Sequence, residues 1–190
     1  MNSMDTEAIE TVRQKIVVAI NETDIVVQAT VDTVTQILVT AFKDLGPESA
    51  SLNDVIADVA SGVIGGAGQA GADLTQAATG LMLGVLRGPK EVGGSVLHRI
   101  SHTSQVAVRE TAAIGGDFEA VATGLVAGAI EGARKMGVSR AEAAAAAADG
   151  ALKAANSLGS QIFETVQNAV TQSMHGIKVV MKKPELAVSN

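Results

Sequence analysis

Two histidines are the residues whose spacing best suits metal binding. His98 and His102 stand four residues apart, so both would lie on one side of a helix. A zinc site needs three or four ligands, and Glu110 lies two helical turns further along, too far to join without help. No Glu stands between the histidines as in metalloproteases, and Arg99 would bring a positive charge beside a bound cation. A metal-dependent enzyme is one hypothesis for this pair, and a solvent-facing helix surface is the interpretation that we favour.

Carboxylate pairs and a glycine-rich string are the other patterns that could serve chemistry. Asp54 and Asp58 fall at a predicted helix start, and so do Glu7 and Glu10, where acidic groups suit the helix dipole. No Glu-x-x-His motif accompanies them, so a di-iron bundle site is not predicted. The glycines of residues 62–68 follow a predicted helix, whereas a dinucleotide-binding loop follows a strand. We therefore assign no catalytic, cofactor-binding or metal-binding residue, and we expect a protein that is not an enzyme.

Composition limits how the elements around these residues can pack. The 190 residues include three Phe, no Tyr, no Trp, no Cys and 20 Gly. The lack of Cys excludes disulfides, thiolate catalysis and Cys-ligated zinc. Because aromatic side chains usually supply much of the buried area, a core built from Ala, Val, Ile and Gly requires helices that approach one another closely.

Charge and hydropathy indicate where such a protein works. The net charge is −6, and residues 1–60 carry ten acidic against three basic side chains. An acidic chain without a basic face predicts no nucleic-acid binding, and Lys178, Lys182 and Lys183 suit a helix C-terminus. The N-terminal residues do not form a signal peptide, and the longest charge-free apolar run, residues 59–72, is shorter than the about 20 residues of a spanning helix. We expect a soluble, cytoplasmic protein.

An internal repeat organises the chain. Residues 71–95 and 115–139 share ten identical positions at an offset of 44. Further matches at twice this offset extend the register to four units, at about 7–50, 51–94, 95–138 and 139–182. Each unit is predicted to hold two antiparallel helices. The sequence thus predicts an all-α fold of about eight helices, a compact bundle or a short solenoid, in one domain over residues 1–183 with a tail at 184–190.

Capping residues predict where these helices begin and end. Asp117 suits an N-cap, Gly137 suits a left-handed C-terminal residue, and Ser139 with Glu142 matches a capping box whose helix ends at Gly159. A stripe spaced four and three residues apart predicts a helix in the first unit: Val27, Val31, Val34, Leu38, Ala41 and Leu45. Gly46-Pro47 should end that helix. Pro89 should end or kink another near Arg87.

Glycines four residues apart form two ridges in the middle units. They are Gly80, Gly84 and Gly88, and Gly124, Gly128 and Gly132. The equivalent positions of the outer units are mainly polar: Gln36, Thr40 and Asp44, and Asn168, Gln172 and Gly176. Small residues let two helix backbones approach closely. We therefore expect the ridges to pack inside the array and the outer columns to face solvent.

One stretch carries a resemblance to known proteins. Residues 122–159 read ATGLVAGAIEGARKMGVSRAEAAAAAADGALKAANSLG, a small-residue ridge followed by a Gly stop and a Ser cap. This stretch resembles uncharacterised bacterial Gly/Ala-rich helical-repeat proteins, and the resemblance implies an all-helical fold and a bacterial source. The 44-residue period is also similar to that of apolipoprotein-like and lipid-droplet-coating helices. Those helices are rich in Lys and Glu and poor in Gly, unlike this chain.

These observations favour a non-enzymatic structural or protein-interaction role, with self-association as one form of it. The mean hydropathy of +0.29 is high for a soluble chain, which supports an interaction surface. The alternative is a protein that binds apolar ligands or lipid surfaces through amphipathic helices. No cofactor is predicted.

Overall fold

The computed structural model describes residues 3–22, 25–45, 51–88 and 95–172. These residues form eight α-helices and no strand, which confirms the predicted all-α class. The helices are α1 (Ser3–Glu22), α2 (Val26–Leu45), α3 (Ser51–Gln69), α4 (Leu74–Arg87), α5 (Val96–Ala113), α6 (Phe118–Met136), α7 (Arg140–Leu158) and α8 (Ser160–Thr171). The division into four equivalent units and the single domain over 1–183 stay predictions.

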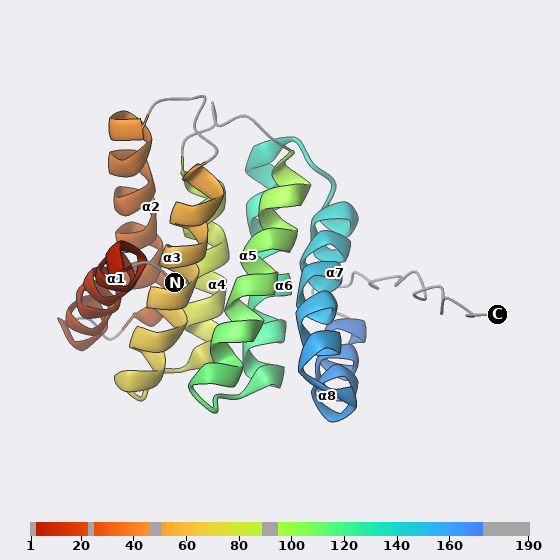
Figure 1. Cartoon of the computed structure of the whole chain (residues 1–190). Helices are drawn as coiled ribbons and strands as arrows, with labels where there is room; N and C mark the ends of the chain where they lie inside the picture. Colours follow the sequence, from red (N-terminus) through yellow and green to blue (C-terminus); the bar gives the residue numbers. More distant parts are fainter. Residues whose placement is uncertain (1–2, 23–24, 46–50, 89–94, 173–190) are drawn as a thin grey trace.

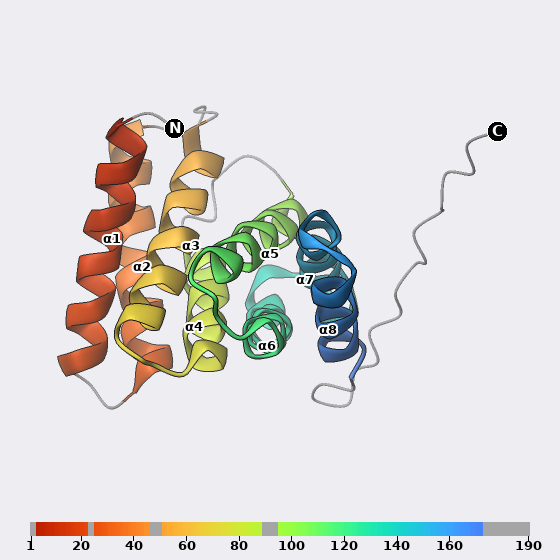
Figure 2. The same ribbon diagram turned by 60° about the horizontal axis from the view of Figure 1, so that its bottom comes forward.

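The helices are arranged in two layers (Figures 1 and 2). The odd-numbered helices α1, α3, α5 and α7 follow one another in one layer, and the even-numbered helices follow one another in the other. The most extensive contacts accordingly join helices two apart in the chain: α4 with α6, α5 with α7, α1 with α3, and α2 with α4. The pair α1 and α2 forms one end of this array, and α7 and α8 form the other.

Several predicted helix ends are confirmed. The Asp117 side chain accepts a hydrogen bond from the Ala120 N–H, 3.0 Å away, at the start of α6. Gly137 ends that helix in the left-handed region, at φ 70°, where a residue without a Cβ is favoured. Ser139 and Glu142 form the predicted capping box of α7, which ends at Leu158. The helix predicted from the apolar stripe of the first unit is α2, and Val31, Val34 and Leu38 of that stripe are buried.

Other predictions meet the limits of the described residues. The helix expected to end or kink near Arg87 does end there, as α4. Gly46, Pro47, Pro89 and Gly176 lie outside the described ranges. The three C-terminal lysines and the tail at 184–190 also lie outside them.

The glycine ridges pack inside the array, each against the preceding even-numbered helix. A Cβ added at Gly84 of α4 would lie 2.6 Å from Val34 Cβ of α2. A Cβ added at Gly128 of α6 would lie 2.7 Å from the Thr79 carbonyl oxygen of α4. Real Cβ atoms do not approach neighbours so closely, so these helices meet at distances that only glycine permits. The ridges thus face two different helices, α2 and α4, and do not face each other.

The odd-numbered layer uses glycines in the same way. The glycines of residues 62–68 lie within α3 and do not form a loop. A Cβ added at Gly62 would lie 2.5 Å from Val12 Cβ of α1, and one added at Gly66 would lie 2.9 Å from the Arg13 carbonyl oxygen. On α7, Gly150 lies directly against the Ser101 carbonyl of α5. The string that resembles a nucleotide loop therefore serves helix packing.

Positions related by the offset of 44 residues form what we call a column, and helix contacts are less extensive where a column lacks glycine. Val106 of α5 lies in the same column as Gly62 and Gly150, and α3 contacts α5 less than it contacts α1. Asn168 and Gln172 occupy the ridge column at the C-terminal end, and both are exposed. Gln36 and Thr40 are exposed at the other end, as predicted for the outer columns.

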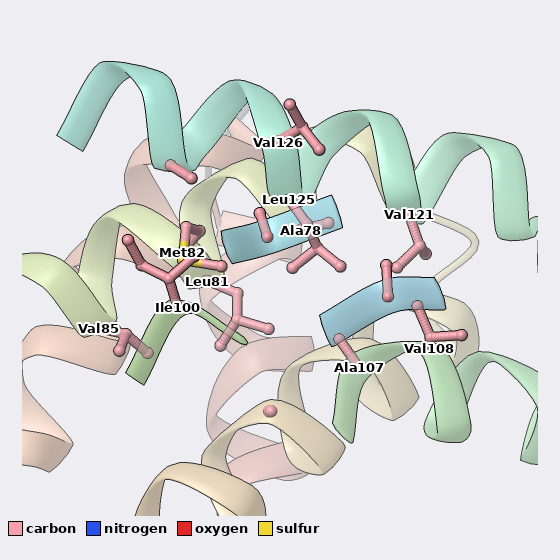
Figure 3. Packing of buried hydrophobic residues seen from close by; sticks show 14 of the residues in the cluster. Ala78, Leu81, Met82, Val85, Ile100, Ala107, Val108, Val121, Leu125 and Val126 are labelled. Carbon is pink, nitrogen blue, oxygen red and sulfur yellow. The ribbon is translucent and has the colours of Figure 1, made fainter. Parts of the chain in front are cut away.

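The core lies between the layers and consists mainly of small and branched side chains. Figure 3 shows part of it, with apolar side chains of α4, α5 and α6 gathered between the ribbons. Alanines supply the buried face of α7: Ala143, Ala144, Ala147, Ala148, Ala151, Ala154 and Ala155. Among the described helices, none is both long and apolar enough to cross a membrane.

Gly128→Leu should destabilise the fold by about 3 kcal/mol, because a side chain at this position must displace the Thr79 carbonyl and Met82. Gly84→Leu should behave similarly against Val34. Thermal melting followed by circular dichroism measures both effects. Glu131→Leu, at an exposed position of the same helix as Gly128, is the matched control. If both glycine variants melt like the parent, the ridges do not lie at a contact.

Candidate functional site

The histidine pair lies on the outer side of α5. The rings of His98 and His102 are stacked, with centroids 6.3 Å apart and planes 9° from parallel. His102 Nε2 lies 3.2 Å from the Asn53 carbonyl oxygen of α3, and because that oxygen can only accept, Nε2 donates in this contact. The contact ties α5 to the start of α3 and occupies one of the two ring nitrogens through which His102 could bind a metal.

Arg99 is placed differently from the position expected beside a bound cation. Its residue surface is only 4% exposed, and it shares the buried face of α5 with Ile100 and Thr103. Burial lowers the pKa of the Arg99 guanidinium, because desolvation disfavours the charged form. Arg99 therefore belongs to the inner side of α5, whereas His98 is exposed to solvent.

The predicted carboxylate pairs do not assemble into a site. Asp54, Glu7 and Glu10 are exposed, and the two pairs lie on different helices, α3 and α1. In the ranges that the structure describes, no three His, Asp or Glu side chains are grouped so that they could hold one metal ion.

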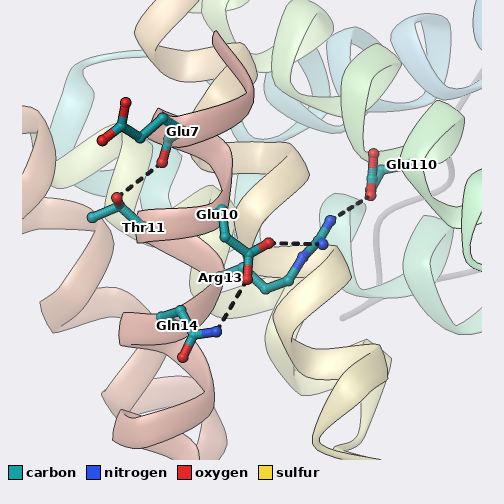
Figure 4. A network of polar contacts seen from close by, with 6 residues as sticks. All are labelled: Glu7, Glu10, Thr11, Arg13, Gln14 and Glu110. Carbon is teal, nitrogen blue, oxygen red and sulfur yellow. Dashed lines mark hydrogen bonds and ion pairs between the residues drawn. The ribbon is translucent and has the colours of Figure 1, made fainter. Parts of the chain in front are cut away.

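A network of polar contacts centred on Arg13 joins charged side chains of two helices, α1 and α5 (Figure 4). Arg13 Nη1 lies 3.1 Å from Glu10 Oε2, one turn earlier on α1. Its other terminal nitrogen, Nη2, lies 3.7 Å from Glu110 Oε1 on α5. Gln14 Nε2 donates to Glu10 Oε1 over 3.0 Å. The arginine thus links α1 to α5, which belong to the same layer and are separated by α3.

A glycine of α3 makes room for this link. A Cβ added at Gly65 would lie 2.9 Å from both Nε and Nη2 of Arg13. The Glu110 side chain is only 18% exposed, so the pair is partly withdrawn from water. Burial raises the pKa of Glu110, and this effect outweighs the attraction of Arg13 and the hydrogen bond with Ser61, which both lower the pKa.

This network can hold three helices in register, and nothing in its geometry identifies a reacting group. Sequence reasoning considered Glu110 only as a distant metal ligand and did not single out Arg13. The one sequence feature that could have indicated this network is Gly65, which lies on the side of α3 that contacts Arg13. A glycine in a helix indicates that a neighbour comes close, but it does not indicate whether that neighbour is a backbone or a long side chain.

The second candidate is a pair of adjoining hollows between α1 and α2. One hollow, of about 360 Å³, is lined by Glu7, Ala8, Thr11, Val12, Lys15 and Ile37. The other, of about 510 Å³, is lined by Lys15, Thr33, Gln36, Ile37, Thr40 and Ala41. Lys15 and Ile37 line both, so the hollows form one groove along the end of the array. We call this surface the α1/α2 groove.

Two large apolar side chains lie exposed at the same end of the array. Val18 of α1 is 52% exposed, and Ile25, directly before α2, is 62% exposed. Val18 follows Lys15 by one helical turn, so it extends the side of α1 that lines the groove. Apolar side chains next to a groove are typical of surfaces that bind a partner.

Glu110→Gln should raise the free energy of unfolding at pH 7 relative to the parent, because the raised pKa means that the ionised carboxylate is disfavoured in the fold. With a folded pKa above the unfolded one, the contribution of Glu110 is fully present at low pH and is lost as pH rises through the folded pKa. The advantage of Gln should therefore shrink on acidification. Urea unfolding between pH 4 and pH 7 measures this, with exposed Glu131→Gln as the control. A difference that stays constant with pH would contradict the proposed burial effect.

Comparison with known proteins adds no identification. No protein-family model matches the chain, and no curated protein matches it. The resemblance to bacterial Gly/Ala-rich helical-repeat proteins therefore stays a prediction.

Proposed function

We propose that this chain is a non-enzymatic structural protein that associates with other protein surfaces, including copies of itself, through the end formed by α1 and α2. The observation that carries the proposal is the exposure of Val18 and Ile25 at that end, 52% and 62%. Val18 lies one helical turn beyond Lys15, which lines the α1/α2 groove. Burying such side chains against a partner removes apolar surface from water and favours association.

The arrangement of the helices supports an association role at this end. Each inner helix has neighbours on both sides within its layer, whereas α1 and α2 have a neighbour on one side only. Ile37, on the floor of the groove, is only partly buried although it packs against the core. A partner seated on α1 and α2 would complete the burial that inner helices receive from their neighbours.

Light scattering after size-exclusion chromatography tests self-association. We expect a mass above that of the monomer that rises with protein concentration. The double variant Val18→Lys, Ile25→Lys should weaken association about tenfold or more, because charged side chains replace apolar surface that association would bury. Gln167→Lys, at an exposed position of α8, should leave it unchanged. A strict monomer at every concentration would contradict self-association.

Binding of apolar ligands or lipid surfaces is a second candidate function, favoured by the α1/α2 groove. Its larger hollow combines the apolar side chains of Ile37 and Ala41 with the cationic Lys15. This combination suits an amphiphile that carries a negative charge. Vesicle flotation tests it: we expect the protein to float with anionic vesicles and Lys15→Gln to reduce the floating fraction. No binding to vesicles of any charge would exclude this function.

A further inference from the structure

Glu7 and Lys15 form a charge pattern on the outer side of α1 that is complementary to itself. Both line the same hollow of the α1/α2 groove. Eight residues separate them, which is about 12 Å along a helix at 1.5 Å per residue. None of the ion pairs found among the described residues, which join Arg13 to Glu10 and Glu110 and Lys153 to Asp149, involves Glu7 or Lys15. One side of the helix therefore presents a negative and a positive charge without an ion-pair partner among the described residues.

Continuation of the array by head-to-tail stacking does not suit this end. Inside the array, the later helix of each closest pair presents at least one glycine to the earlier one. At the offset of 44, the position of Gly62 on α3 is taken by Val18 on α1. The positions of Gly80 and Gly84 on α4 are taken by Gln36 and Thr40 on α2. These larger side chains keep another helix from approaching α1 and α2 as closely as inner helices approach each other.

We propose that the α1/α2 groove is the interface of a two-fold symmetric dimer in which α1 of one copy packs antiparallel to α1 of a second copy. The pairing rests on the proposed self-association and specifies its geometry. With Thr11 at the symmetry axis, Glu7 of each copy lies opposite Lys15 of the other. A two-fold interface requires such a self-complementary surface, because each contact occurs twice.

Side-chain sizes along α1 fit this arrangement. Ala8 and Thr11 lie between the two charges and are small, so two antiparallel helices can approach at the axis. The pairing places α1 of each copy over the groove of the other, where it covers the partly exposed Ile37. Two charge pairs at the rim fix the register, and apolar contacts beneath them supply the affinity.

A charge-swap series measured by light scattering and sedimentation equilibrium tests the dimer. Lys15→Glu and Glu7→Lys each place two like-charge pairs in the interface, so each should raise the dimer dissociation constant about tenfold or more. The double variant Glu7→Lys, Lys15→Glu reverses both charges and should return the constant to within about threefold of the parent. Both positions are exposed, so the variants should keep the helical circular dichroism of the parent. The matched control is Lys153→Glu with Asp149→Lys, which reverses an i,i+4 pair on α7.

The outcomes separate this inference from the function on which it rests. Weakening by each single variant with recovery in the double variant would support the antiparallel dimer. A dimer unaffected by the substitutions would overturn the inference and leave self-association standing. Weakening without recovery in the double variant would also overturn the two-fold register. A parent protein that stays monomeric would overturn self-association and the dimer together.

Discussion

The close approach of helices through glycine columns is the constraint on which the rest of the structure depends. Each glycine in a helix interior costs about 1 kcal/mol relative to Ala, so its presence needs compensation. The four most extensive helix contacts provide it, because each places at least one glycine of one helix against a neighbour two helices away. Backbones that meet this closely gain dispersion and Cα–H···O contacts, which offset the small buried area available to a chain with only 2% aromatic residues.

The same constraint explains why the ends of the array differ from its middle. Where the column carries Val106, or Asn168 and Gln172, the helix contacts become less extensive. At α1 and α2 the column carries Val18 and Gln36, and no described helix lies on the outward side. This end holds the α1/α2 groove, and Val18 lies exposed one turn beyond Lys15 of its lining. The end of the glycine columns is thus also the end through which we propose that the molecule associates.

How much the sequence could predict depended on whether a feature was local. Helix ends at Asp117, Gly137 and Ser139 follow from caps that involve residues within one turn, and these were predicted correctly. The ridges were correctly placed at contacts, but spacing alone does not say which helix receives them. The link from Arg13 past Gly65 to Glu110 joins three helices far apart in sequence, and no local pattern encodes it. The α1/α2 groove was not predicted for a similar reason. It arises because no described helix packs on the outer side of α1 and α2, and no local sequence pattern indicates this.

A double-mutant cycle at Gly84 and Val34 tests the central role of the glycine columns most directly. A Cβ at Gly84 of α4 would lie 2.6 Å from both Cβ and Cγ1 of Val34 on α2. Gly84→Ala should therefore lower the free energy of unfolding in the parent. In a Val34→Gly background, where those two atoms are absent, the same substitution should cost markedly less stability, since Ala is favoured over Gly in helices by about 1 kcal/mol. An equal loss of stability in both backgrounds would contradict the account, because the glycine would then not be required by its neighbour.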